Sequence, residues 1–206
     1  MTKNGTRAPL TLVVLNSKGG VGKTATTMML AAAFTEAGRT VEVWDADPQG
    51  SASEWIEDAT EERGAPLPIR HEAVKRTILA RGQSSAEVLL IDTPPGDPDT
   101  QTAAAARADL VIVPTEAAPA DVPRVFATVD ALGQAVPSVV LLNKVEPHTL
   151  THADTLAVLE AEGVPYFATM IPRRQLFKRA FGTWPTTRQL GLWTELAAEI
   201  ETRMTR

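Results

Sequence analysis

The stretch Asn16-Ser17-Lys18-Gly19-Gly20-Val21-Gly22-Lys23-Thr24 joins an apolar run, Leu10–Leu15, to a helix-like stretch, Thr24–Ala37. Glycines let backbone N–H groups turn toward phosphate oxygens, and the start of the following helix adds partial positive charge. In such a pattern Lys23 would reach the β- and γ-phosphates of a nucleotide, and the Thr24 hydroxyl would bind Mg²⁺. The stretch therefore predicts a phosphate-binding loop between a strand and a helix, although Ser17 replaces the usual first glycine.

Short apolar runs alternate with longer helix-like stretches along the chain, which is typical of βαβ units. The expected strands are Leu10–Leu15, Val41–Trp44, Val88–Ile91, Leu110–Val113, Val139–Leu142 and Tyr166–Met170. The expected helices are Thr24–Ala37, Ser51–Ala59, Asp99–Arg107, Ala120–Leu132, Thr151–Glu162 and Leu192–Met204. We therefore expect an α/β fold with a doubly wound, mostly parallel central sheet flanked by helices. The strand ends that would share its ligand-binding edge are Asn16, Asp45, Asp92, Pro114 and Asn143.

The length and composition of the chain exclude several classes of protein. The 206 residues favour one domain over residues 1–206, with a short disordered tail at 1–9. The chain has no cysteine, which excludes a disulfide scaffold, a thiolate zinc site, an iron–sulfur cluster and a cysteine nucleophile. The apolar runs are shorter than the ~20 residues that span a bilayer, and the tail lacks the apolar core of a signal peptide. A cytoplasmic protein is expected.

The net charge of −5 hides an uneven distribution. Between Glu162 and Glu195 there is no acidic residue, so this basic window carries +5 and the rest of the chain −10. Its cations are Arg173, Arg174, Lys178, Arg179 and Arg188.

Lys18 is a second lysine, five residues before Lys23, and it adds a cation that a phosphate cradle does not need. The K-G-G-x-G-K-T spacing resembles the deviant Walker A box of the ParA/MinD superfamily of P-loop ATPases. The resemblance implies the P-loop NTPase fold, ATP and Mg²⁺ as cofactors, and a homodimer in which Lys18 reaches the partner's phosphates as an arginine finger would. The implied nucleotide cradle is Lys18, Gly19, Gly20, Val21, Gly22, Lys23, Thr24 and Ala25. The alternative for Lys18 is a solvated loop lysine.

Asp45-Ala46-Asp47-Pro48-Gln49-Gly50 resembles the D-x-D-P-Q box of that superfamily. Carboxylates at i and i+2 of an extended strand end point to one face. This arrangement suits one carboxylate for the Mg²⁺ side and the other for orienting the attacking water. We assign Asp45 to the first role and Asp47 to the second, and the reverse order is an alternative. An Asp-Pro turn is the alternative, and it leaves Asp45 unexplained.

Leu89-Leu90-Ile91-Asp92-Thr93-Pro94-Pro95-Gly96 resembles a Walker B box, in which Asp92 would hold Mg²⁺ through water and the Pro-Pro-Gly segment would sense the γ-phosphate. The predicted metal-binding residues are Thr24, Asp45 and Asp92. The predicted catalytic residues are Lys18, Lys23, Asp45 and Asp47.

The expected base pocket lies at the end of Val139–Leu142. Asn143 occupies the place where the superfamily recognises adenine, and Ile171-Pro172-Arg173 resembles the segment that packs over the base. Asn143 is alternatively a strand-end turn residue. Lys144 is followed by Val145 and Glu146, so the N-K-x-D guanine motif is absent and ATP is favoured over GTP.

Composition separates the branches of the superfamily. The missing cysteines exclude the nitrogenase iron protein and arsenite-pump types, and Tyr166, the only tyrosine, disfavours the bacterial tyrosine kinases. MinD-type regulators end in a basic amphipathic membrane helix, whereas Leu192–Met204 carries three glutamates and favours a core-packing helix without stable membrane association. A MinD-like membrane regulator and an amide or cyclo-ligase of the cobyrinate- or dethiobiotin-synthetase kind remain alternatives.

The remaining resemblance is to small ParA-type partition ATPases, close to the ParF form. It implies ATP-dependent dimerisation, non-specific DNA binding on the nucleoid, and slow hydrolysis stimulated by a centromere-binding ParB- or ParG-like partner, which would drive plasmid or chromosome segregation. The candidate DNA contacts are Arg174, Lys178, Arg179 and Arg188.

Overall fold

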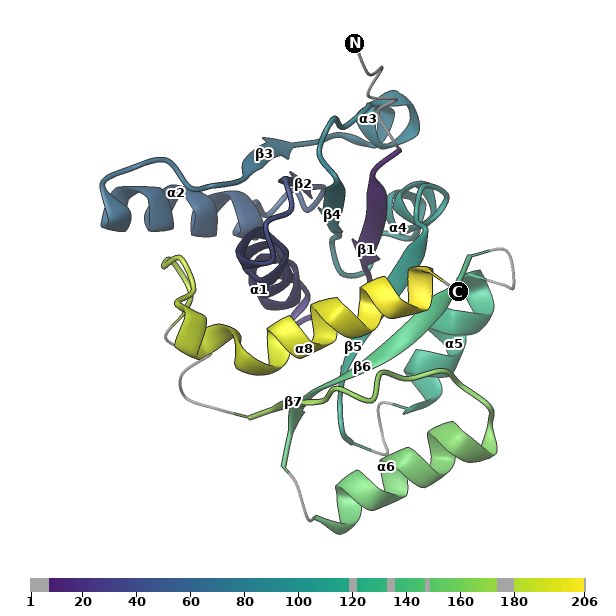
Figure 1. The fold of residues 1–206 in the computed structure, drawn as a ribbon. Helices are drawn as coiled ribbons and strands as arrows, with labels where there is room; N and C mark the ends of the chain where they lie inside the picture. Colours follow the sequence, from purple (N-terminus) through teal and green to yellow (C-terminus); the bar gives the residue numbers. More distant parts are fainter. Residues whose placement is uncertain (1–7, 119–121, 133–135, 147–148, 174–179, 206) are drawn as a thin grey trace.

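A seven-stranded parallel sheet forms the centre of the computed structural model, which describes residues 8–118, 122–132, 136–146, 149–173 and 180–205 (Figure 1). The strand order is β3-β2-β4-β1-β5-β6-β7. The strands are β1 (Leu10–Val14), β2 (Val41–Asp45), β3 (Arg70–Ala73), β4 (Val88–Asp92), β5 (Leu110–Glu116), β6 (Ser138–Val145) and β7 (Ile171–Pro172). The helices are α1 (Lys23–Glu36), α2 (Ser51–Arg63), α3 (Arg76–Arg81), α4 (Pro98–Ala105), α5 (Val122–Leu132), α6 (Leu150–Ala161) and α8 (Thr187–Met204).

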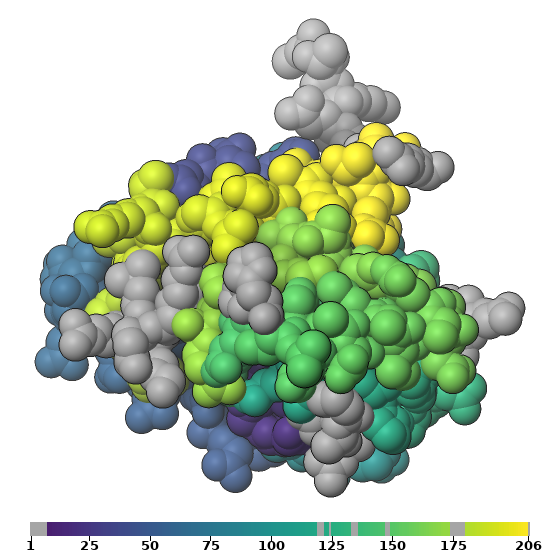
Figure 2. Space-filling model, turned by 90° about the horizontal axis from the view of Figure 1, so that it is seen from below, coloured from purple at the N-terminus to yellow at the C-terminus, as the bar shows by residue number. Residues whose placement is uncertain are grey.

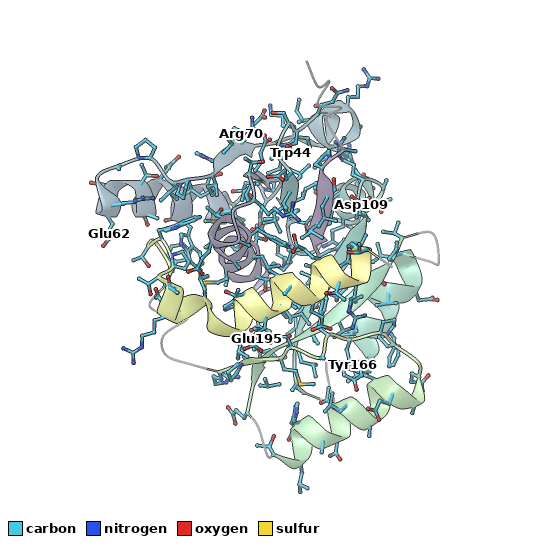
Figure 3. All side chains as sticks on the ribbon, in the orientation of Figure 1. Trp44, Glu62, Arg70, Asp109, Tyr166 and Glu195 are labelled. Atoms are coloured by element: carbon cyan, nitrogen blue, oxygen red, sulfur yellow. The ribbon has the colours of Figure 1, made fainter. Side chains whose placement is uncertain are left out.

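Helices cover both faces of the sheet because its inner strands are apolar on both sides. On β1, Leu12 packs into the cluster shared with α1, α2 and α8, whereas Val13 packs into the cluster shared with α3 and α4. Trp44, labelled in Figure 3, belongs to this second cluster. The guanidinium of Arg107 lies 5.0 Å from the centroid of the Trp44 ring. The expected doubly wound α/β fold is confirmed.

The structure adds β3 and α3 to the expected elements. All four residues of β3 are exposed, and their sequence, Arg-His-Glu-Ala, carries no apolar alternation. The strand forms because β2 offers its free edge, pairing Glu42 with Arg70 through Asp45 with Ala73. Edge pairing by backbone groups therefore created an element that side-chain pattern could not indicate.

The expected strand Tyr166–Met170 is wrong. Tyr166 makes only an isolated bridge to Val140, and β7 forms later, at Ile171–Pro172. The reason is a competing acceptor, since the backbone N–H groups of Ala168 and Thr169 donate to the Glu199 carboxylate of α8 at 2.9 and 3.0 Å.

The last helix packs against the core, as its glutamates predicted. Trp193, Leu196, Ala197 and Ile200 are buried between α8 and α1. Figure 2 shows the outer surface of α8 in yellow beside the green segment that contains α6. None of the described helices is long and apolar enough to cross a bilayer.

Candidate functional site

The glycine-rich loop lies where the connections of the sheet change direction. β2 and β3 lie on the β4 side of β1, whereas β5, β6 and β7 lie on the other side, so the carboxyl end of β1 opens into a crevice. Gly20 and Gly22 have φ of 77° and 94°, and residues with a Cβ rarely adopt such values. A Cβ on Gly22 would lie 2.5 Å from Nδ2 of Asn143, so this position requires glycine for its backbone and for its surroundings.

The start of α1 fits an anion. Among the described side chains, none caps its N-terminus at Gly22, and its first turn contains no acidic residue. The first N–H groups of a helix have no partner within the helix, and they carry partial positive charge. The loop and the first turn of α1 therefore form a cradle suited to phosphate oxygens.

Lys23 and Asp92 are buried together beneath this cradle. The amine of Lys23 donates to the carbonyl oxygen of Lys18 at 3.2 Å. Burial lowers the pKa of Lys23, and the charges of Asp92 and Asp47 partly oppose that shift. Burial also raises the pKa of the Asp92 carboxyl to about 7, against a hydrogen bond from Thr24 that favours the ionised form. A cation placed here would stabilise the Asp92 carboxylate.

Hard oxygen donors suited to Mg²⁺ meet at the same point. The hydroxyl of Thr24 donates to Oδ2 of Asp92 at 2.7 Å, and that of Thr27 donates to Oδ1 at 3.4 Å. In the described part of the chain, no group of three or more histidine, cysteine or acidic side chains could hold a metal ion alone. Mg²⁺ commonly uses one or two carboxylates together with substrate phosphates and water, so Thr24 and Asp92 fit an ion that arrives with a nucleotide.

Asp45 and Asp47 lie beside Asp92 but differ in their partners. Asp45 is the register partner of Asp92 in the pairing of β2 with β4. One oxygen of its carboxylate accepts from the backbone and the hydroxyl of Ser53, both at 2.8 Å, and the other accepts from the backbone N–H of Asp47 at 3.1 Å. Asp45 thus anchors the turn into α2, which is the structural role that the sequence left unexplained. Asp47 is partly exposed and contributes charge near Lys23.

A cavity of about 390 Å³ adjoins the loop, within the range of small-molecule sites. Several of the residues predicted for the nucleotide line it: Gly22, Ala25, Asn143, Pro172 and Arg173. Ile171 is buried in β7 and does not line the cavity. Nδ2 of Asn143 donates to the carbonyl oxygen of Val21 at 3.1 Å, so this side chain also contacts the loop.

Aromatic side chains that no sequence motif indicated form the far wall of the cavity. They are Trp55, Phe181 and Trp193, with Met29 beside them. The rings of Trp55 and Phe181 lie 5.0 Å apart, and the indole N–H of Trp55 donates to the carbonyl oxygen of Thr183 at 2.8 Å. Such a wall suits the flat face of a base. No local signal could have found these residues, because they come from three separate segments.

The basic window divides between two environments. Arg173 pairs with Glu146 at 3.1 Å and with Glu116 at 3.5 Å, so its charge is largely neutralised beside the cavity. Arg188 is exposed at the start of α8. The other predicted DNA contacts, Arg174, Lys178 and Arg179, lie outside the described residues.

Comparison with known proteins gives the family. The model of the "CobQ/CobB/MinD/ParA nucleotide binding domain" matches residues 12–183. The "Maintenance of carboxysome distribution protein A" of Gloeobacter kilaueensis is 37% identical over 177 residues, 84% of this chain and 81% of that protein.

Two solved structures share the fold. A protein described as a plasmid partition protein of Borrelia burgdorferi B31, bound to AMPPNP, has a TM-score of 0.76 and 17% identity, covering 95% of this chain and 99% of that one. The cobyrinic acid a,c-diamide synthase of Mycobacterium smegmatis, with an ATP analogue and magnesium, has a TM-score of 0.75 and 21% identity, covering 95% of each. With the loop, the acidic pair and the cavity in place, the chain belongs to the CobQ/CobB/MinD/ParA nucleotide-binding family and is an ATPase whose cofactors are ATP and Mg²⁺.

Proposed function

We propose that the protein is a ParA-type positioning ATPase. In this proposal ATP joins two copies into a sandwich dimer that binds DNA non-specifically. A ParB- or ParG-like partner on the cargo then stimulates hydrolysis, and the dimer opens and leaves the DNA. Plasmid or chromosome segregation is one such use, and the carboxysome-distribution relative supports a protein compartment as an alternative cargo for the same cycle.

The observation that carries this proposal is the position of Lys18. Its backbone is held on both sides, because its N–H donates to Oδ1 of Asn16 at 2.9 Å and its carbonyl accepts from Lys23. Lys18 is partly exposed between the exposed residues Ser17 and Gly19, whereas Lys23 is only 7% exposed. Lys23 suffices as the cation inside the cradle, so a second lysine at the outer rim is suited to phosphates held by another copy.

The remaining site residues take roles that follow from their contacts. Lys23 would bind phosphates from within the protomer, and Thr24 with Asp92 would hold Mg²⁺. Asp47 would orient the attacking water. Asp45 is better suited to positioning the turn that carries Asp47 than to contacting Mg²⁺, since its hydrogen bonds come from that turn and from α2, whereas those of Asp92 come from α1 at the phosphate loop. Slow basal turnover is expected because the partner completes the site.

Replacing Lys18 tests the dimer. Lys18→Ala should abolish the ATP-dependent increase in mass measured by size exclusion with light scattering, while ATP still binds, because Lys23 and the loop remain. Lys75→Ala removes an exposed lysine before α3 and is the matched control, which should dimerise like the parent. A Lys18→Ala protein that still dimerises with ATP would refute the role of Lys18 across the dimer.

The ligase alternative is supported by likeness of fold to the cobyrinic acid a,c-diamide synthase. The two functions differ in what changes ATP turnover. A positioning ATPase should bind DNA with ATP and respond to a DNA-bound partner. The ligase would be favoured if DNA leaves ATP turnover unchanged and a carboxylic acid together with an amine donor raises it.

A further inference from the structure

Lys144 lies at the end of β6 in an unusual backbone conformation. Its φ is 54°, and among the described residues other than glycine it alone has a positive φ. The pairing of β6 with β7 shifts register between Asn143 and Val145, on either side of it. Residues with a Cβ disfavour positive φ, and such backbone conformations persist where surrounding contacts hold them. The contacts of Lys144 must therefore offset this strain.

These contacts lead to the phosphate loop. Nζ of Lys144 donates to the carbonyl oxygen of Gly20 at 2.5 Å and pairs with Oε1 of Glu116 at 2.7 Å. Next to it, Nδ2 of Asn143 donates to the carbonyl oxygen of Val21 at 3.1 Å. Two adjacent side chains of β6 thus hold two consecutive carbonyl groups of the loop.

Holding these carbonyls also aims the N–H groups that follow them. In a trans peptide the C=O of one residue and the N–H of the next point in opposite directions, and the described chain has no cis peptide bond. With the carbonyl of Gly20 turned toward β6, the N–H of Val21 points away from β6. The Asn143 contact does the same for the N–H of Gly22. These are backbone donors that a bound phosphate requires.

We propose that Lys144, held by Glu116, is a positioning residue that sets the Gly20–Val21 peptide in its phosphate-binding orientation before the nucleotide arrives. Donors that are already oriented bind an anion without the cost of reorganisation. Lys144 acts on the phosphates through this peptide and does not need to touch them. The inference rests on nucleotide binding by the family and is independent of the proposed dimerisation and DNA binding.

If the ion pair of Lys144 with Glu116 had only a structural role, its loss would have a different effect. The side chains of Lys144 and Glu116 are 35% and 28% exposed, and an ion pair this exposed contributes little to folding stability. The strain at φ 54° opposes folding as well. A structural role would therefore appear in thermal stability, whereas a positioning role would appear in affinity for phosphates.

Lys144→Gly separates the two roles. Glycine adopts φ 54° without strain, so the variant loses the amine and keeps the backbone. We expect its melting temperature to equal or exceed that of the parent, and its affinity for ADP, measured by calorimetry, to fall roughly tenfold. Lys144→Arg, which keeps a charged donor, should recover most of this affinity. ADP is the probe because its binding requires neither the dimer nor hydrolysis.

Two further measurements complete the test. Adenosine, which has no phosphate, should bind the parent and Lys144→Gly equally. Glu116→Gln should weaken ADP binding in the parent and have a smaller effect in Lys144→Gly, because there only the pairing of Glu116 with Arg173 remains to be lost. Unchanged ADP affinity in Lys144→Gly would overturn the proposal. Lys144 also lines the cavity, so equal losses for adenosine and ADP would overturn the proposal too, since they would trace the effect to the cavity lining and not to the phosphates.

Discussion

Gly22 meets two independent requirements at the first turn of α1. Its φ of 94° lies in the left-handed region, and a Cβ would approach Nδ2 of Asn143 to 2.5 Å. Gly38, after α1, meets only the first, with φ of 82° and no atom within 4 Å of a built Cβ. The pair separates the cost of backbone strain from the cost of crowding.

Gly22→Ala should destabilise the protein by about 2–4 kcal/mol, because strain adds to displacement of the Asn143 amide from Val21. Gly38→Ala should cost only about 1 kcal/mol. Urea unfolding measures both, and calorimetry should show that only Gly22→Ala loses ATP binding. Equal destabilisation by the two variants would contradict the crowding at Asn143. Adding Asn143→Ala to Gly22→Ala should recover part of the stability, since the obstructing amide is gone.

At the scale of secondary-structure elements, hydrogen bonds to α8 take the place of strand pairing at Tyr166–Met170. Glu199 accepts the backbone N–H groups of Ala168 and Thr169, and Arg203 donates both to Glu199 at 3.0 Å and to the carbonyl oxygen of Tyr166 at 2.9 Å. Partial burial opposes ionisation of Glu199, but these hydrogen bonds outweigh it, so its pKa lies below the 4.5 of an unperturbed glutamate. Ionised Glu199 therefore stabilises the fold.

Glu199→Gln should lower the free energy of unfolding by about 1 kcal/mol at pH 7. A depressed pKa contributes stability above the unfolded value of 4.5, and this contribution is lost as the pH falls through the folded value. The difference between parent and variant should therefore shrink below about pH 4.5, as urea unfolding at about pH 7 and about pH 3.5 would show. Glu195→Gln, exposed on the same helix, should stay within about 0.5 kcal/mol of the parent. A constant difference for Glu199→Gln would exclude the ionised contacts as its cause.

At the scale of the whole molecule, charge is divided between regions. The outer face of α2 is acidic, with Glu54, Glu57, Asp58, Glu61 and Glu62 along it, and Glu62 lies near its far end (Figure 3). Arg188 of the basic window is exposed at the start of α8, whereas Arg173 is paired with acidic side chains. If the protein binds DNA as proposed, its phosphates would favour the Arg188 side over the α2 face.

If the ATP-bound dimer binds DNA through the basic window, log K should fall with log salt at a slope of roughly −4 to −5. Arg188→Ala removes one cation from each protomer and should make this slope about 2 units shallower. Arg63→Ala, at the end of the acidic α2, should leave it unchanged. Fluorescence anisotropy with a short random duplex measures both slopes. Equal effects of the two variants would argue against a DNA contact at Arg188.

Local chemistry along the chain was enough to predict the loop, the acids at strand ends and the doubly wound fold class. It consists of glycines that permit positive φ, β4 residues apolar enough to be buried on both faces, and acids that follow strands directly. Neighbouring residues encode such features, so the order of residues alone was sufficient to place Lys23, Thr24 and Asp92 at one edge of the sheet.

The aromatic wall of the cavity and the hold of Lys144 on Gly20 arise only from tertiary contacts. Each depends on groups brought together from distant segments, such as Trp55 with Phe181 or Lys144 with Glu116. The same holds for the strand that was wrongly predicted at Tyr166–Met170. There the backbone N–H groups of Ala168 and Thr169 donate to Glu199, about 30 residues later in the chain. A backbone N–H group donates to the acceptor that the tertiary fold places beside it. A local sequence pattern cannot indicate an acceptor from a distant segment.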